Sequence, residues 1–283
     1  MAAGGCFPCR LGVRPGWRIW DHGCMGEESV EYRTAVTVDD FRTNLADVQA
    51  RIDSARERSP HGQPVRLLPV SKTVPEDRIR RAIEAGCTEL AENKVQEAHR
   101  KWQALADQPV TWSVIGHLQT NKAKLVAEFA REFHALDSVR LAEALDRRLQ
   151  AAGRELDVFV QVNTSGEESK FGLAPQEVEG FVAELPRFPA LRVKGLMTLA
   201  VFSPDVERVR ACFVLLRDLR DRLQSTAPEG VDLSGLSMGM SGDFELAIEE
   251  GATVVRVGQA IFGARAVPDA HYWPAGTDRV PPT

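Results

Sequence analysis

From residue 65 onward, hydrophobic and polar positions repeat with two alternating patterns. Short apolar runs predict buried strands, and the amphipathic stretches between them predict helices. The expected strands span residues 65–72, 88–92, 111–116, 132–136, 156–162, 191–197, 233–238 and 253–257. The expected helices span residues 38–58, 77–85, 94–106, 121–130, 139–151, 175–185, 204–224 and 243–250.

Strands that alternate with helices predict a parallel sheet, and eight such units predict closure into a single (β/α)8 barrel. The eighth unit requires the segment after residue 257 to supply the last helix or to cap the barrel. A doubly wound open sheet is the alternative. No G-x-G-x-x-G follows the first expected strand, which weakens the dinucleotide-binding version of that fold.

The 283 residues suit one barrel and leave no room for a second domain. Residues 1–36 are expected to be a disordered or mis-started N-terminal segment, because they are rich in Gly, Pro, Arg and Trp and show no helix or strand period. Met25 is a more natural start. Residues 37–266 are expected to form the barrel, and residues 267–283 a C-terminal tail.

Composition narrows the class of protein. A net charge of −5 gives no general attraction to nucleic acid or to an anionic membrane. No apolar run reaches the roughly 18 residues of a membrane span. The five cysteines are an odd number in a long chain, which favours a reducing cytoplasm without structural disulfides. Cys6, Cys9, His22 and Cys24 fit no ordinary zinc spacing. We expect a cytoplasmic monomer without a metal.

Lys72 closes the first expected strand. The carboxyl ends of barrel strands are where active-site groups of this fold gather. A partly desolvated lysine amine at such a position can form a Schiff base with an aldehyde. Considered alone, Lys72 is better explained as a surface lysine just beyond a strand, because most lysines are exposed.

Two loops at the same end of the barrel could hold a phosphate. Ser241 and Gly242 precede the helix expected at 243–250, where a hydroxyl, backbone N–H groups and the helix dipole all favour an anion. Gly258 follows the eighth strand and allows backbone to approach a ligand closely. A capped helix start and an ordinary glycine turn would explain either loop alone. Barrels often bind phosphate with the loops after strands seven and eight, so the pair indicates such a site.

Arg256 lies inside the apolar strand expected at 253–257. A charged side chain is costly to bury unless it has a partner. We expect Arg256 to point inward or toward the top of the barrel, where the ring nitrogen or phosphate of a ligand would be a suitable partner. The alternative is a side chain that points toward the outer helices and reaches water.

Six motifs in this order are similar to those of a known family. They are Pro69-Val70-Ser71-Lys72-Thr73, Glu92-Asn93-x-Val95-Gln96-Glu97, Ile115-Gly116-His117-Leu118-Gln119-Thr120-Asn121-Lys122, Gly195-Leu196-Met197-Thr198, Ser237-Met238-Gly239-Met240-Ser241-x-Asp243 and Val255-Arg256-Val257-Gly258-x-x-Ile261-Phe262-Gly263. From about residue 38 to 266 the chain resembles the pyridoxal phosphate homeostasis proteins, also called the YggS or PROSC family.

The resemblance implies a barrel like the N-terminal domain of alanine racemase, with pyridoxal 5'-phosphate held as a Schiff base on Lys72. It places Arg256 at the pyridine nitrogen and Asn93 near the ring. Gln259 stands where the family has a small hydroxyl residue, and Ala91 where it has glycine. The implied cofactor-binding residues are Lys72, Asn93, Met197, Ser241, Gly242, Arg256, Gly258 and Gln259.

The resemblance also implies a function without established catalytic turnover. Members are thought to buffer the cofactor and deliver it, with apo forms of pyridoxal phosphate enzymes as possible partners. The alternative is a single-domain pyridoxal phosphate-dependent amino acid racemase or lyase. A third hypothesis is a barrel enzyme on another phosphorylated substrate with Lys72 as an aldolase-like base, which leaves the six-motif match unexplained.

Two features favour the carrier over the enzyme. A cationic Arg256 at the pyridine nitrogen keeps that nitrogen unprotonated, which weakens the ring as an electron sink. A two-base racemase also needs an acid–base residue on the face opposite the lysine. The two tyrosines, Tyr32 and Tyr272, are expected in terminal segments outside the barrel. A weak racemase-type activity stays open.

Overall fold

The computed structural model describes residues 32–264 except residue 168, so the expectations for residues 1–31 and 267–283 lie outside the described part of the chain. Its strands pair in parallel throughout, as alternation with helices predicts. The strands are β1 (Arg66–Pro69), β2 (Glu89–Glu92), β3 (Thr111–Val114), β4 (Glu132–Leu136), β5 (Leu156–Gln161), β6 (Leu191–Met197), β7 (Gly235–Ser237) and β8 (Val254–Val257).

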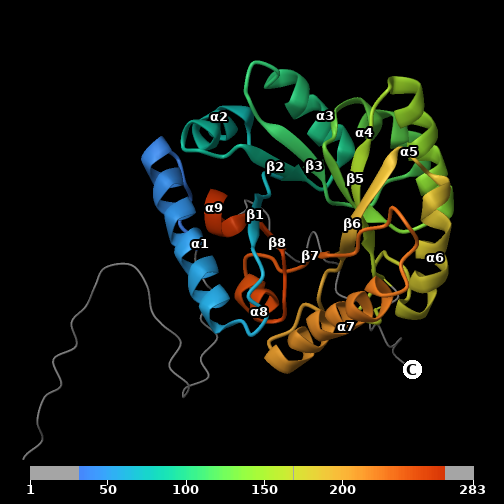
Figure 1. Ribbon diagram of the computed structural model, residues 1–283. Helices are drawn as coiled ribbons and strands as arrows, with labels where there is room; N and C mark the ends of the chain where they lie inside the picture. Colours follow the sequence, from blue (N-terminus) through green and yellow to red (C-terminus); the bar gives the residue numbers. More distant parts are fainter. Residues whose placement is uncertain (1–31, 168, 265–283) are drawn as a thin grey trace, which may run out of the picture. The chain divides into compact units, whose positions relative to one another are not determined.

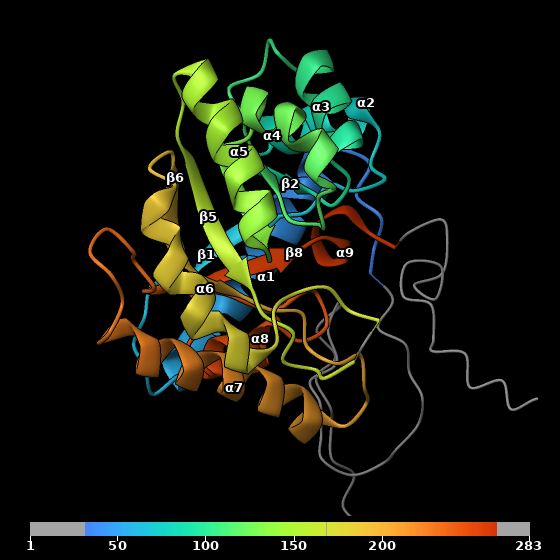
Figure 2. The same ribbon diagram turned by 90° about the vertical axis from the view of Figure 1, so that its right-hand side faces the viewer.

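The eight strands form one sheet in the order β1-β8-β7-β6-β5-β4-β3-β2. Its two outer strands, β1 and β2, meet through a parallel bridge between Val70 and Ala91, and the Ser71 N–H donates to the Ala91 carbonyl over 3.0 Å. The sheet therefore closes on itself, and helices surround it in both views (Figures 1 and 2). The expected (β/α)8 barrel is confirmed.

The helix after the eighth strand is short, and the helix that precedes the first strand packs over the same part of the barrel. Within the described residues, a single four-residue helix follows β8. The helix that precedes β1 packs against the helices that follow β1, β7 and β8 (Figure 1). The helices are α1 (Val38–Arg58), α2 (Glu76–Glu84), α3 (Val95–Ala104), α4 (Ala123–Phe129), α5 (Val139–Ala152), α6 (Val178–Glu184), α7 (Val206–Gln224), α8 (Phe244–Glu249) and α9 (Gln259–Phe262).

The first strand is shorter than its apolar run. The expected strand reached residue 72, whereas β1 ends at Pro69 and Val70 makes only the closing bridge. The chain then turns, and Thr73 has a φ of 66°, the one positive φ of a non-glycine residue in residues 32–264. Lys72 is therefore in a turn beyond the strand, directly before a residue in a left-handed backbone conformation.

Residues 32–36, which the sequence places in the N-terminal segment, contact the barrel. The side chain of Ala35 is fully buried, and its carbonyl accepts hydrogen bonds from Nε and Nη2 of Arg78 over 3.0 and 2.6 Å. The Val36 carbonyl accepts another from Arg81. These bonds attach the chain before α1 to helix α2.

None of the helices in residues 32–264 is long and apolar enough to cross a membrane. The same part of the chain contains no group of three or more His, Cys, Asp or Glu side chains arranged to hold a metal ion.

Candidate functional site

The residues that the sequence suggests for a site all fall at one end of the barrel, because the carboxyl ends of parallel strands share one edge. Met197 is the last residue of β6, and Arg256 lies in β8. The others follow strands directly or through short loops. They are Lys72 after β1, Asn93 after β2, Ser241 and Gly242 after β7, and Gly258 and Gln259 after β8.

The turn that carries Lys72 is fixed on both sides. The Ser71 hydroxyl donates to Oε1 of Glu92 over 2.7 Å, and the Ser71 carbonyl accepts a 2.9 Å hydrogen bond from Nζ of Lys101. On the other side, the Thr73 N–H donates to Oε1 of Glu97 over 3.0 Å. Lys72 itself is half-buried. The backbone before and after Lys72 is thus held by side chains of β2 and α3.

These side chains form a buried ion cluster. Nζ of the fully buried Lys101 lies 2.7 Å from Oε1 of Glu92 and 2.8 Å from Oε1 of Glu97. Burial raises the pKa of Glu92, and the charge of Lys101 opposes that shift. Oε2 of Glu92 is buried without a hydrogen-bond partner. Sequence reasoning missed Lys101, because Glu97 and Lys101 have the i,i+4 spacing of an ordinary surface pair.

The two loops suggested for a phosphate meet in the structure. Oγ of Ser241 accepts hydrogen bonds from the backbone N–H groups of Gly258, over 3.1 Å, and Ala260, over 3.5 Å. A Cβ on Gly242 would meet no atom within 4 Å, and one on Gly258 would lie 3.1 Å from the Val70 carbonyl oxygen. Oγ of Ser241 accepts in both bonds and keeps its own proton to donate, which, with the open space at Gly242, fits a small anionic group such as a phosphate.

Tyr32 corrects one expectation. Its hydroxyl donates to the Ser241 carbonyl over 2.7 Å, so Tyr32 lies against the loop after β7 and not outside the barrel. Burial is the main reason that its pKa is raised, and the phenol therefore stays protonated at neutral pH. Tyr32 holds the loop in place and is poorly suited to act as a base. Tyr272 lies outside the described residues.

Arg256 points into the barrel, as expected from its position in an apolar strand. It is 3% exposed, and its guanidinium donates from Nη1 to Oγ of Ser237 over 2.7 Å and from Nη2 to the Thr198 carbonyl over 2.8 Å. Burial lowers its pKa to about 10, against the charge of Asp243, so it remains a cation at neutral pH. Both hydrogen-bond partners are uncharged, and a ligand atom with a lone pair or a negative charge suits this group.

The remaining suggested residues are less informative in themselves. Met197 is fully buried, whereas Asn93 and Gln259 are half-buried. The backbone of Asn93 packs closely against Gly116, because a Cβ added at Gly116 would lie 2.2 Å from the Asn93 carbonyl oxygen. Gly116 thus lets the loop after β3 approach the end of β2. His117 in the same loop stacks on Phe171, with ring centroids 3.8 Å apart.

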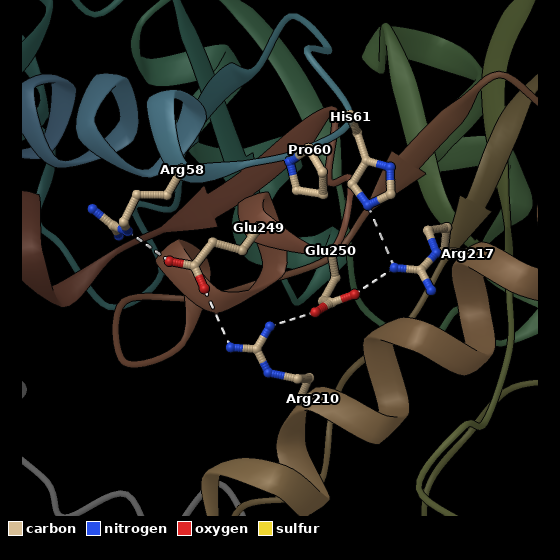
Figure 3. A pocket seen from close by; sticks show the side chains of 7 residues that line it. All are labelled: Arg58, Pro60, His61, Arg210, Arg217, Glu249 and Glu250. Carbon is tan, nitrogen blue, oxygen red and sulfur yellow. Dashed lines mark hydrogen bonds and ion pairs between the residues drawn. The ribbon is translucent and has the colours of Figure 1, made fainter.

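The hollow drawn in Figure 3 lies at the opposite end of the barrel. Arg58 and His61 come just before β1, and Glu249 and Glu250 just before β8. Glu249 pairs with Arg58 over 2.8 Å and with Arg210 over 3.2 Å. Glu250 pairs with both Arg210 and Arg217. These ion pairs link α1, α7 and α8, and we interpret the hollow as structural.

Comparison with known protein families identifies the class of domain to which this barrel belongs. Residues 43–266 match the family described as alanine racemase, N-terminal domain, which agrees with the barrel and with the site at the carboxyl ends of its strands. The match spans nearly the whole described barrel.

Relatives then give the particular family. The chain is 42% identical over 222 residues to the pyridoxal phosphate homeostasis protein of Aquifex aeolicus, covering 78% of this chain and 96% of that protein. It is 42% identical over 225 residues to that of Pseudomonas aeruginosa, covering 78% and 94%. The structure of PipY from Synechococcus elongatus PCC7942 with PLP bound matches with a TM-score of 0.70 and 34% identity, covering 79% of this chain and all of PipY. The chain belongs to the family of pyridoxal phosphate homeostasis proteins.

Proposed function

We propose that this protein binds pyridoxal 5'-phosphate as a Schiff base on Lys72, buffers it and delivers it to apo-enzymes. The observation that carries the proposal is the convergence, at one barrel end, of Lys72 in its fixed turn with two backbone-lined loops and the buried cation of Arg256. The names of the relatives and the PLP-bound structure of PipY support it.

Each residue has a role in this proposal. Lys72 would supply the amine that condenses with the aldehyde of the cofactor, with release of one water. Ser241, Gly242, Gly258 and the backbone N–H of Gln259 hold the phosphate. Nothing in this role needs the Gln259 side chain, so its departure from a small hydroxyl residue removes at most one contact. Three further residues would lie around the ring, namely Asn93, Met197 and Arg256.

The charges of the site favour a carrier over an enzyme. Arg256 is a cation, and a cation at the pyridine nitrogen disfavours a second positive charge there. The ring is then a weak electron sink, which is unsuited to demanding carbanion chemistry. Tyr32, the one tyrosine in residues 32–264, donates its hydroxyl to the Ser241 carbonyl and stays protonated, so it is poorly suited to be the second base of a racemase.

The test combines turnover with delivery. Cofactor-loaded protein should convert no L- or D-amino acid at a rate near the roughly 1–1,000 per second typical of enzymes, as read by chiral chromatography. Mixed with an apo-enzyme that requires pyridoxal phosphate, it should restore that enzyme's activity. A Lys72→Ala variant should fail to do so. Turnover near about one per second that Lys72→Ala abolishes would make the protein a single-domain racemase or lyase.

A further inference from the structure

A line of polar side chains crosses the interior of the barrel and ends at Arg256. Arg66 in β1 donates to both carboxylate oxygens of Glu132 in β4, over 2.8 and 2.7 Å. Oε2 of Glu132 lies 3.0 Å from Nε2 of His134. Nδ1 of His134 lies 2.9 Å from Oγ of Ser237, which accepts the 2.7 Å hydrogen bond from Arg256.

Two arrangements of protons satisfy every contact in this line, one with a neutral and one with a doubly protonated His134. A guanidinium can only donate, so Oγ of Ser237 accepts from Arg256. The second lone pair of Oγ can accept from Nδ1 if the imidazole is charged, whereas in a neutral imidazole the hydroxyl proton of Ser237 donates to an unprotonated Nδ1. The proton of the neutral imidazole is therefore on Nε2, where it donates to the carboxylate of Glu132.

The surroundings of His134 support this neutral form. The imidazole is fully buried, with the ring of Phe159 at 4.4 Å between centroids. Burial lowers the pKa of His134, and the charges of Arg256 and Arg66 add to the effect while Glu132 opposes it. Burial would raise the pKa of Glu132, but its bonds to His134 and Arg66 lower it to about 2. Glu132 is thus an ionised acceptor at neutral pH.

We infer that His134 is a positioning residue for the cofactor: acting through Ser237, it fixes the guanidinium of Arg256 that faces the ring. The inference rests on the proposed function and deepens it. Ser237 holds Nη1 and the Thr198 carbonyl holds Nη2, so both ends of the guanidinium plane are set. Without Nδ1, the Ser237 side chain loses the contact that orients it, and the Nη1 end of the guanidinium is held less firmly.

Two substitutions separate this role from simple packing. The amide of Asn takes the place of Nδ1 in an imidazole, and the longer amide of Gln takes the place of Nε2. His134→Asn therefore keeps an acceptor for Ser237 and loses the contact with Glu132. His134→Gln keeps the contact with Glu132 and loses the acceptor. Both remove the ring from its packing against Phe159 and should lower the melting temperature by similar amounts.

The cofactor should distinguish the two variants. His134→Asn should bind pyridoxal phosphate with nearly the wild-type affinity and visible absorption band. His134→Gln should bind about tenfold more weakly and shift the band, because Arg256 has lost a fixed partner. Ser237→Ala should match His134→Gln, and combining the two should add nothing further, since they break the same line. Equal weakening in the Asn and Gln variants would overturn the inference.

A second measurement needs no cofactor. In protein labelled with ¹⁵N in histidine, the imidazole signals of His134 should show a neutral ring protonated at Nε2 alone at neutral pH. A proton on Nδ1 would contradict the proposed line, whatever the binding results. If wild-type protein fails to bind pyridoxal phosphate, the proposed function is wrong, and the tautomer of His134 still decides whether the line exists.

Discussion

Nζ of Lys101 lies 2.7 Å from Oε1 of Glu92, and both side chains are fully buried below the turn that carries Lys72. A buried ion pair gains little stability over an apolar replacement, because both charges lose their hydration. Here Lys101 also donates to the Ser71 carbonyl, and Glu92 accepts from the Ser71 hydroxyl. The pair therefore shapes the backbone next to the proposed Schiff-base lysine.

Lys101→Met should strongly destabilise the protein. The substitution leaves the carboxylate of Glu92 buried without its cation, which typically costs about 3–5 kcal/mol of unfolding free energy. Urea denaturation measures the loss. The double variant with Glu92→Gln should recover part of it, because the unpaired charge is removed. Arg80→Met, which breaks the exposed pair of Arg80 with Asp107, is the control and should change stability little. A small effect of Lys101→Met would contradict a structural role for the pair.

Ser241→Asp tests the phosphate loops. A carboxylate at this position replaces the hydroxyl that meets the Gly258 N–H and repels a phosphate. Charge-assisted hydrogen bonds are each worth about 1.5–3 kcal/mol, so pyridoxal phosphate should bind at least about tenfold more weakly. Unphosphorylated pyridoxal should be affected much less in the same titration. Equal weakening of both ligands would place the phosphate elsewhere.

Tyr32→Phe removes one hydrogen bond and leaves the ring in place. The Ser241 carbonyl loses its 2.7 Å donor, and we expect the unfolding free energy to fall by about 1 kcal/mol. Binding of pyridoxal phosphate should weaken as well, because the loop before α8 becomes less well held. Thermal denaturation and a binding titration of the same preparation measure the two effects. Unchanged values for both would show that Tyr32 contributes nothing to the loop.

The buried His134 predicts a specific pH dependence of stability. Its pKa in the folded protein is lowered from 6.5, so below about pH 6.5 the unfolded chain takes up a proton that the folded chain refuses. This contribution is present above pH 6.5 and is lost as the pH falls toward the folded pKa. The charged groups that act on His134 are Glu132, Arg66 and Arg256. Between about pH 7 and 5, wild type should lose more unfolding free energy than His134→Asn, as measured by urea denaturation at each pH.

The sequence predicts the barrel well for a physical reason. Strands that are covered on both faces consist of nearly continuous apolar runs, which are easy to recognise between amphipathic helices. Their carboxyl ends then bring Lys72, Ser241 and Gly258 to one edge without further information. Strand ends are predicted less well, as at Pro69, because the turn through Thr73 depends on side chains from β2 and α3.

Other parts of the site depend on contacts that only the fold creates. The sequence did contain a signal for His134. Glu132 and His134 are two positions apart in one strand, so their side chains point to the same face. Its partner Ser237 is 103 positions away, and no spacing rule connects them. Tyr32 seemed to belong to a terminal segment, yet it bonds to Ser241, 209 positions along the chain. Long-range hydrogen bonds of this kind are set by packing, not by local pattern.

The attachment of the cofactor to Lys72 is the central claim, and one measurement tests it directly. Protein loaded with pyridoxal phosphate is reduced with borohydride, digested and analysed by mass spectrometry. We predict a stable adduct on Lys72, and none in Lys72→Ala treated in the same way. An adduct on another lysine, such as Lys122 or Lys170, with Lys72 unmodified, would contradict the account.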